Sequence, residues 1–371
     1  MADEFLKDFF AGAAMTRLMN SPAIKSEIPS PLPAALYRRS GNGPVGLEVT
    51  WDEVRGHRQL AQLVNQNSPS RSVQLPGVTK RYATGLGAKE NFTLKIDLLQ
   101  ALKSDVPMVR EGARREVVRQ LRDFRQRFDN LRVSLVHSVF ALGAIYADKD
   151  GNVLHSSSGA ATPPSVDFNV PTGNKLTHDG AGSTYNIGDW SNASTNIAAA
   201  CRTIRNANLK ANSYQLTTVM YGQNVPDYLA TNTMLKDYFK EHPAVRQSMV
   251  TDNVIPDGTL GFNWKPVETA FFADATGTAR EWFGGDYLAF TPDISTDWYE
   301  NFPCGTLYPI GTASPGMSLD QMIALCGVAY GYFSYAEMST DPLVAKIIAG
   351  DYGLPVIKVP GTYYFGRCKA A

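Results

Sequence analysis

One helical pattern of unusual length constrains this chain most. Between residues 107 and 142, apolar side chains recur every three or four positions. Their mean spacing of about 3.7 residues matches the α-helical period and places them on one face. At about 1.5 Å per residue the helix would be roughly 50 Å long, more than the core of a compact domain requires. The sequence therefore predicts a strut with one narrow apolar stripe, made of Val109, Ala113, Val117, Leu121, Phe124, Phe128, Leu131, Leu135, Val139 and Leu142.

Both ends of this helix carry clear signals. Pro107 suits the first turn of a helix, and Asp105 is favoured near the positive end of the helix dipole. Glu111 and Asp123 each precede an arginine by four residues, which adds ion pairs on the polar side. The apolar period changes to two after Gly143, so we expect the helix to end there.

Residues 1–72 read as an arm with little regular structure. One short helix is expected from Glu4 to Asn20, and the prolines of residues 28–33 exclude a helix there. Residues 47–51 and 58–64 are short strand candidates. So long an extended stretch is unusual inside a compact domain, and we expect the arm to lie on another surface.

Residues 73–99 are predicted to form a long two-stranded hairpin. Its strands would be residues 78–84 and 91–96, with Gly85 and Gly87 supplying the loop. An isolated hairpin is marginally stable in water, so this one is expected to rest on a neighbour.

The rest of the chain is predicted to be mixed α/β. A tight hairpin is expected where residues 144–147 and 152–155 flank the Asp150-Gly151 turn, and residues 172–189 read as a glycine-rich loop. A helix capped by Ser194 is expected to run to about residue 206. The other expected elements are a helix over residues 225–240 and strands within 215–221, 264–273, 281–290, 325–335 and 355–365.

The amount of charge favours a chain that buries surface against other copies. Charged residues make up 19% of the 371 positions, below the usual value of about 25%. The 44% hydrophobic and 11% aromatic content excludes a disordered chain, and no apolar run is long enough to span a membrane. No basic segment precedes the short apolar stretch of residues 9–15, so the sequence indicates a cytosolic chain without a secretory signal.

The charge is unevenly divided along a chain whose formal net charge is zero. Residues 1–140 hold 21 Lys+Arg and 14 Asp+Glu, which gives +7, and residues 141–371 hold 14 and 21, which gives −7. This asymmetry favours either pairing of basic against acidic parts between copies or a basic part that faces a polyanion. A chance distribution is the third interpretation.

No constellation in the sequence indicates catalysis or a cofactor. The five histidines and four cysteines lack metal-ligand spacing, and there is no HExxH, CxxC or Gly-x-Ser-x-Gly motif. Residues 148–152 have the spacing of a calcium loop without its glycine and glutamate, and residues 85–89 lack the ending of a phosphate loop. We assign no catalytic, cofactor-binding or metal-binding residue, and we expect reduced, mostly buried thiols.

The long helix is rich in arginine as well as in apolar residues. Eight arginines and four acids between residues 107 and 132 leave a net charge of +4. One interpretation is a solvated face that pairs with itself; the other is a surface that contacts DNA phosphates without reading sequence. The candidate DNA-facing residues are Arg114, Arg115, Arg119 and Arg122.

The order of these parts resembles the major capsid proteins of tailed bacteriophages, specifically the lambda-type coat family with the HK97-like fold. No single motif is specific, but the ordered set is, and it covers nearly the whole chain. The stretches that carry the resemblance are residues 49–64, 78–96, the long helix, 141–151, 166–168, 190–191, 341–343 and 354–356.

The resemblance implies an α+β fold with four parts. These are an N-terminal arm (1–72), an extended E-loop hairpin (73–99), a P-domain (100–185, with the spine helix 107–142 and C-terminal strands at about 336–371) and an A-domain (186–335). The hairpin is expected to contact neighbouring subunits through Val78, Lys80, Arg81, Tyr82, Leu86, Lys89, Phe92 and Leu94.

The resemblance further implies a structural protein of the virion that self-assembles, as hexamers and pentamers, into the icosahedral head around double-stranded DNA. Assembly in the host bacterial cytoplasm, without a membrane, is expected. No charged helical segment precedes the arm, which implies a separate scaffolding protein, beside a portal, a candidate decoration protein and non-specific contact with packaged DNA. The alternatives are an encapsulin-like nanocompartment shell and, more remotely, a soluble enzyme with a dispersed active site.

Overall fold

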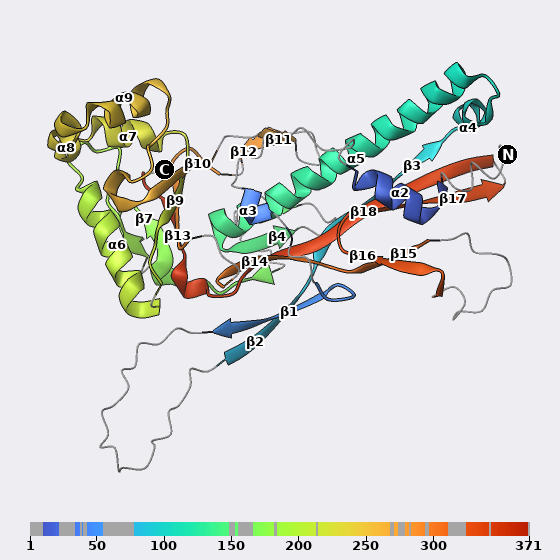
Figure 1. Cartoon of the computed structure of the whole chain (residues 1–371). Helices are drawn as coiled ribbons and strands as arrows, with labels where there is room; N and C mark the ends of the chain where they lie inside the picture. The colour runs from blue at the N-terminus through green and yellow to red at the C-terminus, as the bar shows by residue number, and fades with distance from the viewer. Residues whose placement is uncertain are drawn as a thin grey trace, which may run out of the picture.

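The computed structural model describes an elongated molecule with a group of short helices at one end and the start of a long helix at the other (Figure 1). A ribbon of two strands projects from its middle. The described residues are 10–21, 34–37, 39, 43–54, 78–147, 153–154, 166–181, 184–212, 214–267, 271–273, 279–281, 283–293, 297–310, 324–340 and 343–369.

The long helix predicted from the apolar spacing is present as α5 (Pro107–Leu142), 36 residues with proline in the first turn. The stripe is buried from Ala113 to Phe128, where Val117, Leu121 and Phe128 are nearly inaccessible, but its first residue, Val109, is exposed, contrary to the prediction. The last third differs from the prediction, because residues 133–141 are buried on every side, including the polar Ser134, His137 and Ser138. Here the helix enters the centre of the molecule instead of lying on its surface.

The helix ends as predicted at Gly143. This residue has φ +66° and donates its N–H to the carbonyl oxygen of Val139 at 3.0 Å. A Cβ atom there would lie 3.0 Å from Val170 and 3.1 Å from Phe365. Both the left-handed backbone and the close packing therefore require glycine.

Gly143→Ala is expected to lower the free energy of unfolding by about 1–3 kcal/mol, because alanine is strained in the left-handed region. Denaturant unfolding of the purified subunit measures this. The matched control is Gly112→Ala in the same helix, where a Cβ meets nothing within 4 Å. There alanine should stabilise by up to about 1 kcal/mol. Equal effects of the two substitutions would contradict the assigned role of Gly143.

The hairpin predicted for residues 73–99 is wrong, because its two strands do not pair with each other. Strand β2 (Val78–Thr84) pairs antiparallel with β1 (Glu48–Val54), and Val54 lies opposite Val78. Strand β3 (Leu86–Leu94) pairs instead with β18 (Leu343–Ile357). Strands β1 and β2 thus form the hairpin ribbon, and β2 passes directly into β3 of another sheet.

Close packing, not a turn, explains the glycines between β2 and β3. A Cβ on Gly85 would lie 2.2 Å from the sulfur of Cys304, and one on Gly87 would lie 2.1 Å from the carbonyl oxygen of Asp351. Glycine inside a strand often marks such a close approach. Gly85 and Gly87 therefore suggest a loop in the sequence, although in the structure they lie where β2 leads directly into β3.

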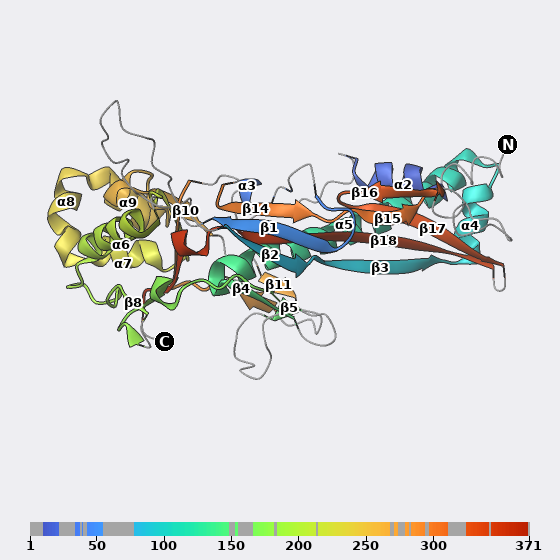
Figure 2. The ribbon, with the colours of Figure 1, turned by 90° about the horizontal axis from the view of Figure 1, so that it is seen from below.

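Strand β18 organises the central sheet. Its 15 residues at about 3.3 Å each span roughly 50 Å, the same length as α5, which runs beside it (Figure 1). Strands β17 (Phe333–Thr340) and β3 pair with its first part, and β14 (Tyr299–Pro303) pairs with its last part, all antiparallel. Figure 2 shows β14, β18 and β3 running along the length of the molecule.

A six-stranded sheet with the order β10-β9-β13-β19-β7-β8 lies toward the helical end. Residues 172–189, predicted as a loop, contribute its last two strands, β7 (Lys175–Thr177) and the edge strand β8 (Tyr185–Asn186). The other strands are β9 (Thr218–Tyr221), β10 (Asn263–Pro266), β13 (Tyr287–Thr291) and β19 (Tyr364–Arg367). The helices are α6 (Ile197–Asn212), α7 (Val225–Thr231), α8 (Lys236–Glu241) and α9 (Pro243–Thr251).

Two predicted helices at this end differ from the observed ones. Asn196, not Ser194, caps α6, because its side-chain oxygen accepts the N–H of Ala199 at 3.0 Å. The helix predicted over residues 225–240 is broken at Asn232. The Asn232 side chain accepts the N–H of Leu235 and donates to the carbonyl oxygen of Thr195, so it competes with the helical hydrogen bonds.

The smaller strands form three further sheets. The predicted hairpin after α5 is present: β4 (Ala144–Ala147) pairs with β5 (Val153–Leu154), while its turn lies outside the described residues. β4 also pairs with β6 (Val166–Asp167). The remaining pairs are β11 (Phe271–Ala273) with β12 (Ala279–Glu281) and β15 (Thr306–Pro309) with β16 (Cys326–Ala329).

The described parts of the arm pack on their own subunit. Helix α2 (Gly12–Met19) buries Met15 and Met19 and exchanges two hydrogen bonds of 3.0 Å between Thr16 and Ser334. Helix α3 (Ala34–Tyr37) lies near β14. The expected helix start at Glu4, the proline run and the strand candidate 58–64 lie outside the described residues.

Three buried clusters follow one another along the molecule. One lies between α5 and the central sheet around Phe124 and Ile347, the second at the centre around Phe140 and Trp298, and the third between the six-stranded sheet and its helices around Trp264. Because α5 contributes to the first two, it joins them into one body.

Candidate functional site

Most of the large exposed apolar side chains of the described residues lie on three parts of the subunit, with Tyr82 apart from them. One group surrounds β15 and β16, a second lies on α4 (Ile96–Lys103) and at the start of α5, and a third lies on the helical end. Clusters of this kind mark contact surfaces, whereas single exposed apolar residues need no explanation. The groups are Val45, Leu47, Leu307, Ile310, Val328 and Tyr330; Ile96, Val106, Met108 and Val109; and Met234, Val250 and Val254.

The first group borders a cavity of about 450 Å³ beside the base of the hairpin. Val45, Leu307 and Phe333 are among the residues that line it. Leu307 lies opposite Val328 in the β15–β16 pair, and both are exposed, while Tyr308 and Ala329 on the same strands are buried. This ribbon is therefore apolar on both faces, one of them open to solvent.

The β1–β2 hairpin has one buried and one exposed face. Trp51 is buried, whereas Tyr82 is 78% exposed and lies opposite Thr50. Lys80 lies opposite Asp52, so the tyrosine has polar neighbours in the register of the two strands. Exposed tyrosines ringed by polar groups are typical anchors of protein–protein contacts.

The eight predicted contact residues are divided between two strands. Val78, Lys80, Arg81 and Tyr82 lie on β2 in the hairpin, and the other four lie on β3 in the central sheet. Leu94 is 1% exposed and belongs to the core, so its assignment as a contact is wrong. Phe92 is half-buried, with its ring 5.1 Å from that of Phe124, and its contact with a neighbour stays a prediction.

The remaining two residues of β3 have mixed surroundings. Leu86 is half-buried against the central cluster. Lys89 is exposed and holds its ammonium group 5.5 Å from the centre of the Tyr335 ring. For Lys89 and the residues of β2, contact with a neighbour stays a prediction.

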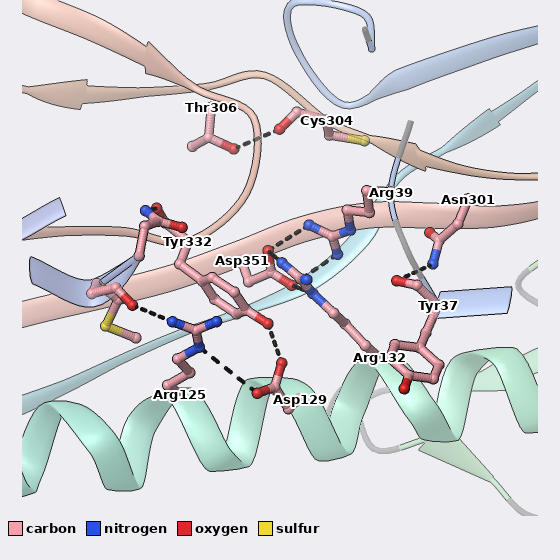
Figure 3. A network of polar contacts seen from close by, with 12 residues as sticks. Tyr37, Arg39, Arg125, Asp129, Arg132, Asn301, Cys304, Thr306, Tyr332 and Asp351 are labelled. Carbon is pink, nitrogen blue, oxygen red and sulfur yellow. Dashed lines mark hydrogen bonds and ion pairs between the residues drawn. The ribbon is translucent and has the colours of Figure 1, made fainter. Parts of the chain in front are cut away.

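Three distant segments meet at the carboxylate of Asp351 on β18 (Figure 3). Arg132 of α5 donates from Nε to Oδ2 at 2.7 Å and from Nη2 to Oδ1 at 2.6 Å. Arg39 of the arm donates from Nη2 to Oδ2 at 2.8 Å and from Nη1 to Oδ1. The side chain of Asp351 is 3% exposed, so one buried carboxylate joins the arm, the long helix and the sheet.

The network continues along α5. The hydroxyl of Tyr332 donates to Asp129, and the Arg132 guanidinium lies 3.9 Å from the Tyr332 ring centre. Arg125 donates to the carbonyl oxygen of Met19 at 2.8 Å and lies 3.9 Å from Asp129. The end of α2 is thereby tied to the same helix.

Electrostatics hold this centre in its charged form. Burial alone would raise the pKa of Asp351, but the charges of Arg132 and Arg39 outweigh it and the pKa lies below its usual value. Burial raises the pKa of Tyr332, so its hydroxyl stays protonated and able to donate. A buried carboxylate with two bidentate guanidinium partners is fully hydrogen-bonded.

Two of the four arginines proposed to face DNA form ion pairs with acids of the same helix. Arg119 donates to Glu116 at 2.9 and 2.6 Å, and Arg114 lies 3.7 Å from Glu111. Hydrogen bonds from Arg119 and Gln120 lower the pKa of Glu116 to about 2. This pairing agrees with the self-paired interpretation of the helix face.

Arg115 and Arg122 are the other two candidates, and both are exposed. They lie two turns apart on α5, which places them on one side of the helix. A DNA contact through these two residues stays a prediction.

The centre at Asp351 was not predicted from the sequence. A signal was present, since Asp351 is the only acid in the strand of residues 343–357, and a carboxylate is almost never buried without a partner. Arg39 and Arg132 could not be named, because they lie 312 and 219 residues away in the chain.

Other kinds of site find little support in the part of the chain that the structure describes. It contains no group of three His, Cys, Asp or Glu side chains placed to hold a metal ion, and no helix long and apolar enough to cross a membrane. Cys201, Cys304 and Cys368 are buried, as expected, and Cys326 is half-buried.

Sequence comparison finds no matching family model and no matching curated protein. The structure is similar to a phage-related protein from Bordetella bronchiseptica RB50, with a TM-score of 0.51, 9% identity and coverage of 95% of this chain and 97% of that one. Two further solved structures are a putative prophage capsid protein of E. coli CFT073 (TM-score 0.45, 14% identity, 79% of each chain) and the capsid of a native GTA particle (0.43, 11%, 94% of each chain). The first likeness shows that this chain shares the fold of that protein along nearly the whole of both chains, and the predicted α+β class is confirmed.

Proposed function

We propose that this chain is the major capsid subunit of a tailed phage and assembles into the icosahedral shell around its double-stranded DNA. The observation that carries the proposal is the shared fold with a phage-related protein along nearly the whole of both chains. We infer a virion protein with a structural role and no catalysis. We also propose that the chain belongs to the lambda-type branch of these capsid proteins.

The distribution of exposed side chains supports this role. Three apolar groups and the projecting hairpin lie at separate places on an elongated subunit. A closed shell needs several different contacts on each copy, because its interfaces are not all related by two-fold symmetry. Many modest contacts then add up to a large buried area.

The parts of the subunit are proposed to correspond to those of a shell protein. The observed hairpin makes residues 48–84 the proposed E-loop, so the arm ends at about residue 47 and β3 joins the P-domain. The proposed spine is α5, and residues 186–335 keep their proposed assignment as the A-domain. Separate scaffolding, portal and decoration proteins are proposed partners, and assembly is placed in the bacterial cytoplasm.

Negative-stain electron microscopy of the expressed chain, alone and with lysate from its native source, tests the proposal. Closed shells or tubes tens of nanometres across are expected under at least one condition. Shells that carry an enzyme instead of DNA would favour an encapsulin-like nanocompartment. A small closed oligomer that never assembles further would contradict the proposal and favour a soluble enzyme.

The double variant Arg115→Gln/Arg122→Gln tests the proposed DNA contact of the spine. Because both side chains are exposed, subunit stability should be unchanged. Filled shells should release DNA at a lower salt concentration, since fewer phosphates are neutralised. The control is Lys236→Gln/Lys240→Gln, which removes the same charge from the helical end. Equal salt sensitivity of the two variants would exclude a specific role for the spine.

A further inference from the structure

Strand β17 lies at an edge of the central sheet. Among the described residues it pairs with β18 alone, so main-chain groups on its other side have no strand to bond. An edge of this kind is a template for pairing with a strand of another chain. In this subunit helix α2 lies beside that edge (Figures 1 and 2).

Two side chains of α2 and its C-terminal end make the hydrogen bonds that a neighbouring strand would make. The hydroxyl of Thr16 donates to the carbonyl oxygen of Ser334 at 3.0 Å and accepts the N–H of Ser334 at 3.0 Å. In an antiparallel ladder the opposite residue exchanges the same two bonds through its own N–H and C=O. One turn later, the Asn20 side chain donates to the carbonyl oxygen of Tyr332 at 2.8 Å. These outward main-chain groups are therefore satisfied without a strand.

The rest of the β17 edge follows from the same alternation. Because the main-chain groups of Ser334 point away from β18, those of Ala336 point the same way. A strand that pairs along all of β17 therefore needs Thr16 to leave Ser334. Farther along, Glu337 of β17 is exposed opposite the exposed Lys346 of β18, and charged side chains on an edge disfavour pairing.

Helix α2 is held on this edge by buried contacts with the body. Met15 and Met19 are inaccessible to solvent, in the cluster that also contains Phe124. Arg125 of α5 donates to the carbonyl oxygen of Met19 at 2.8 Å. A helix of eight residues is not stable alone in water, so α2 keeps its form only while these contacts hold it. Loss of the contacts would uncover the edge.

We propose that the β17 edge is a latent pairing surface for a second copy of this chain, and that α2 blocks it in the separate subunit. With α2 in place, Thr16 occupies both outward main-chain groups of Ser334. With α2 displaced, the same edge of another copy pairs with it antiparallel about a two-fold axis, because identical edges match in length and hydrogen-bond spacing. The block is a property of the subunit alone and does not depend on the proposed function.

The double variant Met15→Asp/Met19→Asp tests the block in the full-length chain. Buried carboxylates without partners are strongly disfavoured, so α2 should leave its place. In dilute, dispersed subunits the Ser334 amide should exchange with deuterium about tenfold faster or more, while the amides of α5 keep their rates. At higher concentration, sedimentation velocity should show self-association where the wild-type chain stays dispersed.

The matched control is Ala14→Asp/Arg17→Gln, which changes the net charge by the same amount on the exposed side of α2. It should alter neither the exchange of Ser334 nor self-association. Equal self-association of the control and the Met15→Asp/Met19→Asp variant would overturn the proposal, because charge alone would then explain the result.

A third substitution separates edge pairing from association through the apolar surface that a displaced α2 uncovers. Ser334→Pro removes the outward N–H of the edge but no bond of the β17–β18 ladder, since this N–H points to Thr16. Added to Met15→Asp/Met19→Asp, it should abolish self-association. Association that persists in this triple variant would refute edge pairing.

Thr16→Val is the finer test, because it keeps the shape of the side chain and removes both bonds to Ser334. The Ser334 amide should again exchange about tenfold faster, and the Tyr335 amide, which belongs to the β17–β18 ladder, should keep its rate. Unchanged exchange of Ser334, or a folded Met15→Asp/Met19→Asp variant that stays dispersed, would contradict the block. Failure of that double variant to fold would do the same, since α2 would then be part of the core. All these measurements use dispersed subunits, so they stand whether or not the chain forms shells.

Discussion

Replacing residues 55–77 by the dipeptide Asn-Gly is expected to give a folded subunit that no longer forms shells. Val54 lies opposite Val78, so a two-residue turn can close the hairpin without changing its register. The buried Val49 and Trp51 stay in place, and the core keeps its contacts. Under the proposed function, the shortened hairpin loses its reach to a neighbouring copy.

Sedimentation and electron microscopy measure assembly in this experiment, and circular dichroism with thermal unfolding measures folding. The point variant Tyr82→Ala is the finer test, because it removes the exposed anchor and leaves β1–β2 pairing intact. It should weaken assembly without changing subunit stability. Normal shells from the shortened chain would exclude the hairpin as an assembly contact.

A deletion tests the hairpin as an assembly contact only if it leaves the central sheet intact. Deleting residues 80–90 would test the hairpin that the sequence pattern suggests. In the structure it would remove the start of β3 and break its pairing with β18 from Gly353 to Ala349. The subunit would then be expected to misfold, and loss of shells would say nothing about contacts between copies.

Asp351→Asn is expected to lower the free energy of unfolding by about 3–5 kcal/mol, because two buried guanidinium groups lose their only shared anion. Urea unfolding of the dispersed subunit measures this. The matched control is Glu116→Gln, which breaks an exposed pair with Arg119 and should give no measurable change. An unchanged denaturation midpoint for Asp351→Asn would contradict the role given to this centre.

The same variant predicts a pH dependence. The pKa of Asp351 is lower in the folded than in the unfolded chain, where it is about 3.9. The stabilisation is therefore complete above that value and is lost as the pH falls through the lower, folded-state pKa. The difference in stability between wild type and Asp351→Asn should be constant near neutral pH and shrink only in strong acid.

Asp351 also shows why a site of this kind escapes sequence analysis. The sequence shows that Asp351 is the one acid in a mostly apolar strand. Its partners, Arg39 and Arg132, come close to it only through the packing of the folded chain. Arg132 resembles the other arginines of α5, and Arg39 lies in an arm that carries no pattern of its own. Only the folded chain distinguishes these two from arginines that pair with neighbouring acids.

Elements defined by local signals could be predicted from the sequence. The period of α5 and its end at Gly143 are set by contacts within a few residues, so the helix has the bounds that the pattern predicts. The pair β4 and β5 was found for the same reason. The pairing of strands could not be predicted in this way. β2 and β3 are adjacent in sequence, yet β2 pairs with β1 and β3 pairs with β18. Which strands pair depends on which surfaces the whole fold brings together. The glycines between them are required by Cys304 and Asp351. Those neighbours lie hundreds of residues away, beyond the reach of any local pattern.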